Sequence, residues 1–454
     1  MSLNGRRVMG NGRRAMGNGR RVMGDGRRLA YLLLLIAGQS FAQHEHHHMD
    51  MEQKDTTAHT MSHAFSQSLP MNRNGSGTGW LPDQTPMYAW MKHGDKWMYM
   101  LHGAVFLRQN FQNINNDYRN GGKQFDAPTW VMGMAQRKIK QNGLLLLRAM
   151  MSLDPFTVGG GGYPLLFQSG ETYKGVPLVN RQHPHDLFSE LAIGYTQKLS
   201  NDLDVSLYLS YPGEPALGPT AFMHRISSMN NPDAPLGHHW QDATHVTFGV
   251  ATLGVRYKKF KLEGSSFTGR EPDEERYDFD KPRFDSYSTR LSYAPTDNFV
   301  LQASRAYINE PEPLHHENVD RTTFSVIYAK RISSDRHVTA TAVWGLNQSG
   351  GHHNEHSILA ESNYQLNRLA FYGRYEYVEK SPSELQIENL DEDVLPVHAF
   401  TLGSNYQLGS WLGTNTALGL QATINKTPGA LEALYGKTPI SMEGYLRIIP
   451  ALMR

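Results

Sequence analysis

The histidines of this chain are its main candidates for chemistry, because many of them occur in pairs and short clusters. The chain contains 21 histidines. Imidazole is the commonest protein ligand for zinc, copper and nickel, and neighbouring histidines raise the local density of ligands. The candidate metal ligands downstream of the N-terminal region are His183, His185, Asp186, His238, His239, His315, His316, His352, His353 and His356.

The sharpest cluster is Gln-His-Pro-His-Asp at residues 182–186. In an extended backbone His183 and His185 point the same way, since side chains alternate with period two, and Asp186 lies beside them. With Glu190 a few residues further on, this group could hold a divalent cation or present a histidine–carboxylate pair. The alternative is a loop that Pro184 stiffens, in which the histidines make ordinary hydrogen bonds.

A second candidate site is the tract His-Glu-His-His-His-Met-Asp-Met near the N-terminus. It supplies the candidate ligands His44, His46, His47, His48, Met49 and Met51. Thioether sulfur beside imidazole suits copper. The alternative is a solvated polar tail. A divalent or copper ion is the only cofactor for which the residues give a reason, and no signature of a bound organic cofactor is present.

Sequence signatures of common enzymes are absent. The chain has no Gly-x-Ser-x-Gly, no His-Glu-x-x-His and no phosphate-binding loop. We therefore expect a channel or binding protein connected with copper or zinc handling. The alternatives are a hydrolase-like outer-membrane enzyme that uses the region of His183, His185, Asp186 and Glu190, and a structural or adhesive barrel without transport.

The elements that would position these residues are strands. Residues 202–211 read Asp-Leu-Asp-Val-Ser-Leu-Tyr-Leu-Ser-Tyr, with leucine and valine on one face and mainly polar residues on the other. Similar segments of mostly nine to thirteen residues recur sixteen times, and a tilted transmembrane strand needs about 9–11. They are expected at 96–108, 127–136, 144–153, 187–198, 202–211, 244–257, 260–267, 284–293, 298–308, 321–330, 337–346, 356–365, 368–378, 398–407, 414–425 and 440–449.

The connections between these segments alternate between short and long. Short connections carry Asn, Asp, Gly or Pro, which tight turns require, and the longest, 154–186 and 212–243, are rich in Gly and Pro. This parity indicates an all-β fold, a single antiparallel transmembrane β-barrel of about 16 strands (14–18), with short periplasmic turns and long outer loops. Aromatic residues at strand ends, such as Tyr257 and Tyr293, would form the interfacial girdles.

The N-terminal region is expected to be an export signal followed by an arm. A seven-residue basic repeat covers residues 4–28, and a run of about ten apolar residues leads to Ser40-Phe41-Ala42, which predicts a signal peptide cleaved after Ala42. Its removal takes eight arginines and one aspartate from 44 basic and 43 acidic residues, leaving a net charge of −6, which argues against nucleic acid as a partner. We expect a leader at 1–42, a disordered periplasmic arm at 43–95 and the barrel at 96–454.

On this pattern the chain resembles bacterial outer-membrane β-barrels of porin-like type. It is similar to barrel proteins of Bacteroidota-type bacteria with His/Met-rich N-terminal arms, which are associated with heavy-metal resistance. The resemblance implies a location in the outer membrane, with lipid, the barrel-assembly machinery, and metal ions or small solutes as partners. The end of the chain, Pro450-Ala-Leu-Met-Arg454, departs from the terminal aromatic residue that such barrels often carry.

Overall fold

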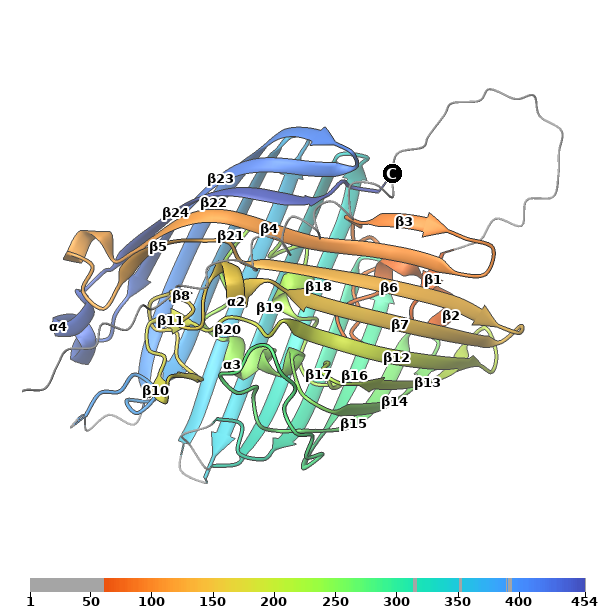
Figure 1. Ribbon diagram of the computed structural model, residues 1–454, viewed down its shortest axis with the longest axis horizontal. Coiled ribbons are helices and arrows are strands. Elements are labelled where there is room, and N and C mark those ends of the chain that lie inside the picture. The colour runs from red at the N-terminus through yellow and green to blue at the C-terminus, as the bar shows by residue number, and fades with distance from the viewer. Residues whose placement is uncertain (1–60, 313–316, 351–352, 389, 391–393, 454) are drawn as a thin grey trace, which may run out of the picture. The chain divides into compact units, whose positions relative to one another are not determined.

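The alternation of apolar and polar residues runs through sixteen long strands, which close into an antiparallel barrel (Figure 1). The computed structural model describes residues 61–453 except 313–316, 351–352, 389 and 391–393. The strands are β4 (Met98–Gln112), β6 (Thr129–Ile139), β7 (Gly143–Ser152), β12 (Phe188–Lys198), β13 (Leu203–Ser210), β14 (Val250–Tyr257), β15 (Phe260–Phe267), β16 (Ser286–Thr296), β17 (Phe299–Ile308), β18 (Val319–Ser333), β19 (Arg336–Ser349), β20 (His353–Leu366), β21 (Leu369–Lys380), β22 (Leu395–Trp411), β23 (Thr414–Lys426) and β24 (Ile440–Pro450).

Each of these strands pairs with its neighbours in the chain, and the last pairs with the first. Closure between β24 and β4 runs from the Met442–Phe111 pair to the Ile448–Val105 pair. The short strands β3 (Trp90–His93) and β5 (Gly122–Asp126) pair with the two ends of β4. The predicted fold class and strand number are therefore confirmed. One strand begins later than predicted, since residues 244–249 belong to a loop and β14 starts at Val250.

The predicted parity of the connections is also confirmed. The described connections at one end of the barrel have two to four residues, from 140–142 between β6 and β7 to 412–413 between β22 and β23. Every connection at the other end is longer than its neighbours in the chain, and the longest are 153–187 and 211–249. We call these two ends the turn end and the loop end. The side chains that the long loops carry are therefore brought in at the same end of the barrel.

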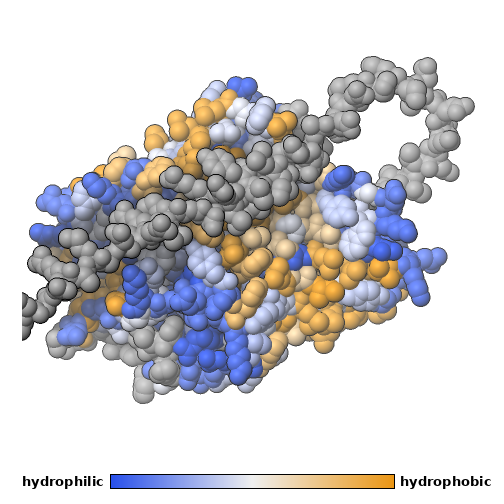
Figure 2. All heavy atoms as spheres, viewed as in Figure 1, coloured by the Kyte–Doolittle hydropathy of each residue, from blue (hydrophilic) through white to orange (hydrophobic). Residues whose placement is uncertain are grey.

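The outward face of the wall is apolar. Leu253, Leu262, Leu402 and Leu420 each expose more than half of their surface although they lie in strands, and Figure 2 shows apolar residues gathered over the strands. Aromatic rings pair across strands near both ends, for example Phe260–Tyr293, Tyr287–Tyr307 and Phe299–Tyr328, with centroids 4.3–5.3 Å apart. Such a band between two aromatic girdles is the surface that a barrel presents to lipid. None of the described helices has the length and apolar character needed to span a membrane.

The remaining described elements are short and belong to the inserts and loops. The strands are β1 (Ser62–His63), β2 (Ser66–Pro70), β8 (Tyr163–Pro164), β9 (Thr172–Tyr173), β10 (Val176–Pro177) and β11 (Arg181–Gln182). The helices are α2 (Asp154–Thr157), α3 (His238–Gln241) and α4 (Glu432–Tyr435), with 3-10 turns η1 (Met71–Arg73), η2 (Ile114–Asn116), η3 (Phe222–His224), η4 (Ala243–His245) and η5 (Gly429–Leu431).

The segment 61–89 lies inside the barrel and is mostly buried. The prediction of a disordered arm over 43–95 is therefore wrong from Met61 onward, and residues 43–60 lie outside the described part, as do the predicted leader and signal peptide. Polar contacts with the wall hold the segment: Ser66 Oγ donates to Asp204 Oδ2 at 2.6 Å, and Arg148 donates to the Gly77 carbonyl at 2.9 Å. A segment of such polar composition is typically disordered in water. Here the polar inner wall supplies hydrogen-bond partners for its buried polar groups.

The loop 211–249 also enters the barrel, and nearly all of it is buried. It reaches several strands of the wall. Arg225 Nε donates to Glu361 of β20 at 2.8 Å, Arg108 of β4 donates to Asp233 at 2.6 Å, and the Leu236 amide donates to Glu376 of β21 at 2.6 Å. Lumen-facing residues of the wall are buried beneath this loop: Arg374 of β21 donates to the Asp233 carbonyl at 2.9 Å, and Glu443 of β24 lies 3.2 Å from Arg108. In the part of the chain that the structure describes, two inserts thus occupy much of the lumen.

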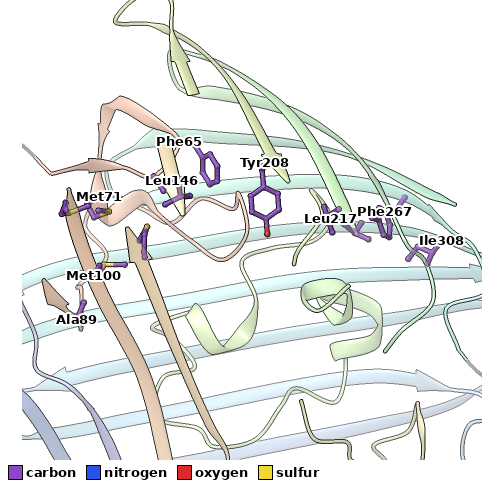
Figure 3. Close-up of a cluster of buried hydrophobic side chains, with 14 of the residues drawn as sticks. Phe65, Met71, Ala89, Met100, Leu146, Tyr208, Leu217, Phe267 and Ile308 are labelled. Atoms are coloured by element: carbon purple, nitrogen blue, oxygen red, sulfur yellow. The ribbon is translucent and has the colours of Figure 1, made fainter. Parts of the chain in front are cut away.

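An apolar cluster joins the N-terminal insert to the wall and extends along it as far as Phe267 of β15 and Ile308 of β17 (Figure 3). Phe65 and Met71 of the insert pack there with Met100 of β4, Leu146 of β7 and Tyr208 of β13. The rings of Phe65 and Tyr208 meet edge to face at 6.0 Å. These contacts add apolar burial to a segment that hydrogen bonds alone would hold weakly.

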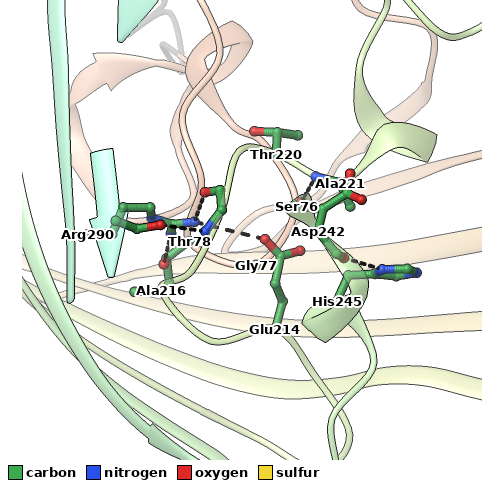
Figure 4. A network of polar contacts seen from close by, with 12 residues as sticks. Ser76, Gly77, Thr78, Glu214, Ala216, Thr220, Ala221, Asp242, His245 and Arg290 are labelled. Carbon is green, nitrogen blue, oxygen red and sulfur yellow. Dashed lines mark hydrogen bonds and ion pairs between the residues drawn. The ribbon is translucent and has the colours of Figure 1, made fainter. Parts of the chain in front are cut away.

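The two inserts meet around Glu214, in a polar network that Figure 4 shows. The Ala221 amide donates to Ser76 Oγ at 2.8 Å, and Arg290 of β16 donates to Thr78 Oγ1 at 2.7 Å. Glu214 lies between them, 4 % exposed, with Arg290 4.0 Å away. Burial raises the pKa of Glu214 to about 8, against the lowering effect of Arg290.

We expect Glu214 to make the stability of the folded barrel fall as pH rises. The native carboxyl keeps its proton up to about pH 8, whereas the unfolded one ionises near pH 4.5, so between these values the native state binds more protons and loses stability with pH. Glu214→Gln should flatten this part of the profile, measured as the apparent unfolding temperature in detergent from pH 5 to 8.5. Glu432→Gln, at an exposed carboxylate of α4, is the control and should keep the wild-type slope. Identical profiles for wild type and Glu214→Gln would contradict the assignment.

We expect a charge on the outward face to destabilise the barrel according to its depth in lipid. Leu253 is 62 % exposed in the middle of β14, and Leu253→Arg should cost about 2–4 kcal/mol in a bilayer. Leu199→Arg, at a leucine 58 % exposed in a turn, should cost about 1 kcal/mol or less. Urea unfolding from lipid vesicles measures both, and equal costs at the two positions would show that the band around Leu253 does not face lipid.

Candidate functional site

Five histidines from two loops meet inside the barrel toward the loop end. Two come from loop 153–187 and three from loop 211–249, and their neighbouring ring centroids lie 5.0–6.4 Å apart. All five are buried or nearly so. We call this group the histidine cluster; its members are His183, His185, His238, His239 and His245.

The Nδ1 atom of every histidine in the cluster faces an oxygen acceptor. Four of the acceptors are carboxylates and one is a backbone carbonyl. The pairs are His183 with Glu171 (3.0 Å), His185 with Asp154 (3.0 Å), His238 with Asp242 (2.7 Å), His239 with Glu271 (3.2 Å) and His245 with the Asp242 carbonyl (2.7 Å). An oxygen acceptor fixes the proton on Nδ1 and leaves the Nε2 lone pair of a neutral ring for another partner. This is the outer-shell arrangement that orients metal-binding histidines.

His185 and His245 point their Nε2 atoms at each other across 3.2 Å. The Nδ1 proton of His185 is directed to Asp154, and that of His245 to the carbonyl of Asp242. Two neutral rings in these tautomers would therefore face each other with lone pairs. A proton or a cation between the two nitrogens converts this repulsion into attraction.

Asp242 connects the cluster to the wall. Its Oδ1 accepts from His238, and its Oδ2 accepts from Arg225 at 2.8 Å and from the Phe222 amide at 3.0 Å. Burial would raise the pKa of Asp242, but His238 and Arg225 hold it well below its usual range. Burial lowers the pKa of His238 to about 4 and that of His245 well below 6.5. The carboxylate is thus charged and both imidazoles are neutral at pH 7.

The other side of the cluster is an ion-pair group around Glu171. Arg276 donates to Glu171 and lies 3.4 Å from Asp186. Although burial opposes ionisation, Arg276 and His183 lower the pKa of Glu171 to about 2, and burial raises the pKa of Asp186 to about 7. Glu171 in turn raises the pKa of His183, against the effect of burial. His183 therefore holds a proton more readily than His238 and His245, whose pKa values burial lowers.

Two glycines allow the loops to approach so closely. Gly170 has a φ of +102°, and a Cβ there would lie 2.4 Å from the His239 ring. Gly345 of β19 faces α3, and a Cβ there would lie 2.4 Å from the Trp240 carbonyl oxygen. The Asn347 amide of the same strand donates to the His239 carbonyl at 3.2 Å. The wall is thus shaped to receive α3 and the histidines that it carries.

The predicted ligands fall into three groups. The structure brings His183, His185, His238 and His239 together, with Asp186 beside them on Arg276. His356 is separate from the histidine cluster: it lies on the outward face of β20, where Trp344 Nε1 donates to its Nδ1 at 3.2 Å. The side chains of His44, His46, His47, His48, Met49, Met51, His315, His316, His352 and His353 lie outside the described residues.

His245 and four carboxylates that face the cluster were not among the predicted ligands; the carboxylates are Asp154, Glu171, Asp242 and Glu271. His245 was assigned to a strand, although the absence of alternation near Asp242 was a signal against one. Asp154, Glu171 and Glu271 come from loops far apart in the chain, and no local pattern marks them as partners of histidine. Their pairing follows only from the way the loops fold into the barrel.

The region proposed for a hydrolase contains hydroxyl groups, but they bond to other partners; Ser189 Oγ donates to the Asp186 carbonyl at 3.3 Å. Glu190 is engaged elsewhere, with Arg148 at 3.2 Å and the Tyr208 hydroxyl at 2.7 Å. The hydrogen bonds of the described residues place no serine or threonine hydroxyl on an Nε2 atom of the histidine cluster. The arrangement therefore fits the orientation of ligands better than the activation of a hydroxyl.

A cavity of about 460 Å³ adjoins the cluster at His239. Five glutamates line it, with Arg321 as its one basic lining residue among those described. The glutamates are Glu271, Glu312, Glu317, Glu355 and Glu384. We call this cavity the acidic vestibule; burial and the neighbouring carboxylates raise the pKa of one of its members, Glu312, to about 8, so not all five glutamates are charged at pH 7. Elsewhere, Asp273, Asp278 and Asp280 form the only described group of three potential ligands with all donor atoms within 4.8 Å, and the first two are exposed.

The fold and the apolar outer wall define a transmembrane β-barrel of the outer-membrane type. The chain is similar to an anion-selective porin from Comamonas acidovorans (10 % identity, TM-score 0.48, covering 78 % of this chain and 100 % of the porin). It is also similar to OmpF of Salmonella typhi in complex with daunomycin (9 %, 0.49, 79 % and 100 %) and to OprB of Pseudomonas putida (10 %, 0.46, 78 % and 94 %). No protein-family model and no curated protein sequence matches the chain.

We expect Asp242→Asn to destabilise the barrel by about 3–5 kcal/mol, because it removes one partner from a buried charge network. Glu361 would be the one carboxylate left to Arg225 among the described residues, beside the Thr220 carbonyl, and His238 would lose its charged acceptor. Asp320→Asn is the matched control: its partner Arg305 lies 3.4 Å away at the surface, so the change should cost about 0–1 kcal/mol. Urea unfolding from lipid vesicles measures both, and a cost for Asp242→Asn no larger than that of the control would contradict the role given to Asp242.

Proposed function

We propose that this protein is an outer-membrane barrel that binds transition-metal cations in its lumen and passes them through the membrane. The observation that supports this best is the 3.2 Å separation of the His185 and His245 Nε2 atoms, with both Nδ1 atoms committed to acceptors. A site of this kind suits Zn²⁺ or copper, since imidazole binds both.

The separation of the two nitrogens fits a shared metal ion. In a tetrahedral zinc site with Zn–N distances of about 2.0–2.1 Å, two ligand nitrogens lie about 3.3–3.4 Å apart. The pair therefore matches one edge of such a tetrahedron. His238 is the nearest further histidine, with its ring centroid 5.0 Å from that of His245, and a rotation of its side chain or a water molecule would complete the site.

The surroundings of the pair support cation binding. The acidic vestibule lies beside His239 at the loop end, and negative potential in a low-dielectric cleft raises the local concentration of cations. The carboxylates behind the histidines increase ligand basicity and fix ring orientation. A lumen occupied by two inserts favours small ions over bulky solutes, which separates this proposal from a general solute pore.

The test is zinc binding by the mature chain in detergent, measured by equilibrium dialysis. We expect the double variant His185→Ala/His245→Ala to bind zinc at least about tenfold more weakly, since metal sites lose about 10–100-fold in affinity even when an outer-shell partner is removed. His356→Ala, on the outward face, is the matched control and should bind as wild type does. Equal affinity in wild type and the double variant would overturn the proposal.

The N-terminal tract is tested in the same assay. Deletion of residues 43–60 removes His44, His46, His47, His48, Met49 and Met51, and we propose that these residues capture copper or zinc before it reaches the lumen. Deletion should lower the number of ions bound per chain and leave the affinity of the luminal site unchanged. An unchanged number of bound ions would contradict a role for the tract.

A further inference from the structure

A second cavity lies deeper in the barrel, on the side of the histidine cluster that faces the N-terminal insert. It has a volume of about 150 Å³ and is bounded by the insert, by β4 and β6 and by loop 211–249. His185 borders both this cavity and the histidine cluster, so the two are contiguous. We call it the methionine cavity, after the five methionines that line it: Met71, Met87, Met100, Met223 and Met229.

The methionines are more frequent here than chance would give. They make up five of the thirty described lining residues, against 20 of 454 residues in the chain, which is nearly four times the frequency. Methionine often fills irregular gaps in a core, but these side chains surround a space that they leave open. They also come from three separate parts of the chain, so no local sequence pattern explains why all five line one cavity.

Two more histidines line the same cavity. His102 of β4 and His224 of η3 have ring centroids 5.4 Å apart, and both rest against Trp130, at 5.3 and 4.7 Å. The Nε2 atom of His102 is buried and has no hydrogen-bond partner among the described residues. A buried nitrogen without a partner costs free energy, and a bound ion would satisfy it.

The potential ligands that line the methionine cavity are almost all uncharged. Asp154 is the only carboxylate among the described lining residues, and its oxygens already accept from His185 and from the Thr129 amide. Thioether and neutral imidazole are soft ligands, which select Cu(I) over harder divalent ions. We propose that the methionine cavity binds a soft monovalent cation, cuprous or silver, through its methionines with His102 and His224. The proposal rests in part on the proposed function, because His185 would pass the ion between the two sites.

The test uses the full mature chain in detergent with silver as a redox-inert probe. The variant Met100→Leu/Met223→Leu keeps side-chain volume, and such changes usually cost less than about 1.5 kcal/mol. We expect it to bind one silver ion fewer per chain and to lose the sulfur scatterers that X-ray absorption detects around silver in wild type. Met134→Leu is the control: Met134 is buried in the same apolar cluster as Met100 but does not line the cavity, and the variant should bind silver as wild type does.

The same assay separates this inference from the proposed function. His245→Ala removes a ligand that lies outside the methionine cavity, so it should weaken zinc binding at the luminal site and bind silver as wild type does. Met100→Leu/Met223→Leu should bind one silver ion fewer per chain and bind zinc as wild type does. Silver bound equally by wild type and the methionine variant would overturn the inference, even if zinc binding follows the proposal. A copurified apolar molecule in the cavity, found by native mass spectrometry in place of silver binding, would also overturn it.

Discussion

The buried carboxylate of Asp242 is the interaction on which the interior of this barrel depends. One of its oxygens accepts from His238 and the other from Arg225, while its carbonyl accepts from His245. Arg225 continues the network to Glu361, and Arg374 joins Glu361 at 3.1 Å from the next strand. A buried charge is tolerated only when such partners are complete. The position of loop 211–249 and the orientation of two histidines therefore follow from the same set of contacts.

The interior needs such a network because the barrel is closed. Alternation that turns apolar residues toward lipid necessarily turns polar ones inward, so the wall offers many donors and acceptors to a narrow lumen. The two inserts satisfy them: Asp204 receives Ser66, and Arg108 receives Asp233. Water is displaced in the process, and the low dielectric that results keeps His238 and His245 neutral. Histidines in an open aqueous pore would titrate near their usual pKa and would be weaker ligands at mildly acidic pH.

The strands of the barrel wall could be predicted from the sequence, because each is marked by a pattern within its own short segment. Leu203 to Tyr211 alternates within a single strand, and turns such as Asn367-Arg368 stand between two alternating runs. The interior needed information that is not local. Residues 61–89 have the composition of a disordered segment, and only the presence of a polar wall around them makes their order favourable. His356 does not join the histidine cluster, because Ser357 beside it is the residue that faces inward on β20.

The ligands along the proposed route change in character from one end of the barrel to the other. Carboxylates line the vestibule at the loop end, imidazoles backed by carboxylates follow, and thioethers with imidazoles line the methionine cavity nearer the turn end. Carboxylates bind many cations weakly, while thioethers bind few cations and prefer soft ones. An ion that favours nitrogen would remain at His185 and His245, whereas one that favours sulfur would be drawn further inward. In this scheme the order of ligand types, and not the width of a pore, sets which metals cross the barrel.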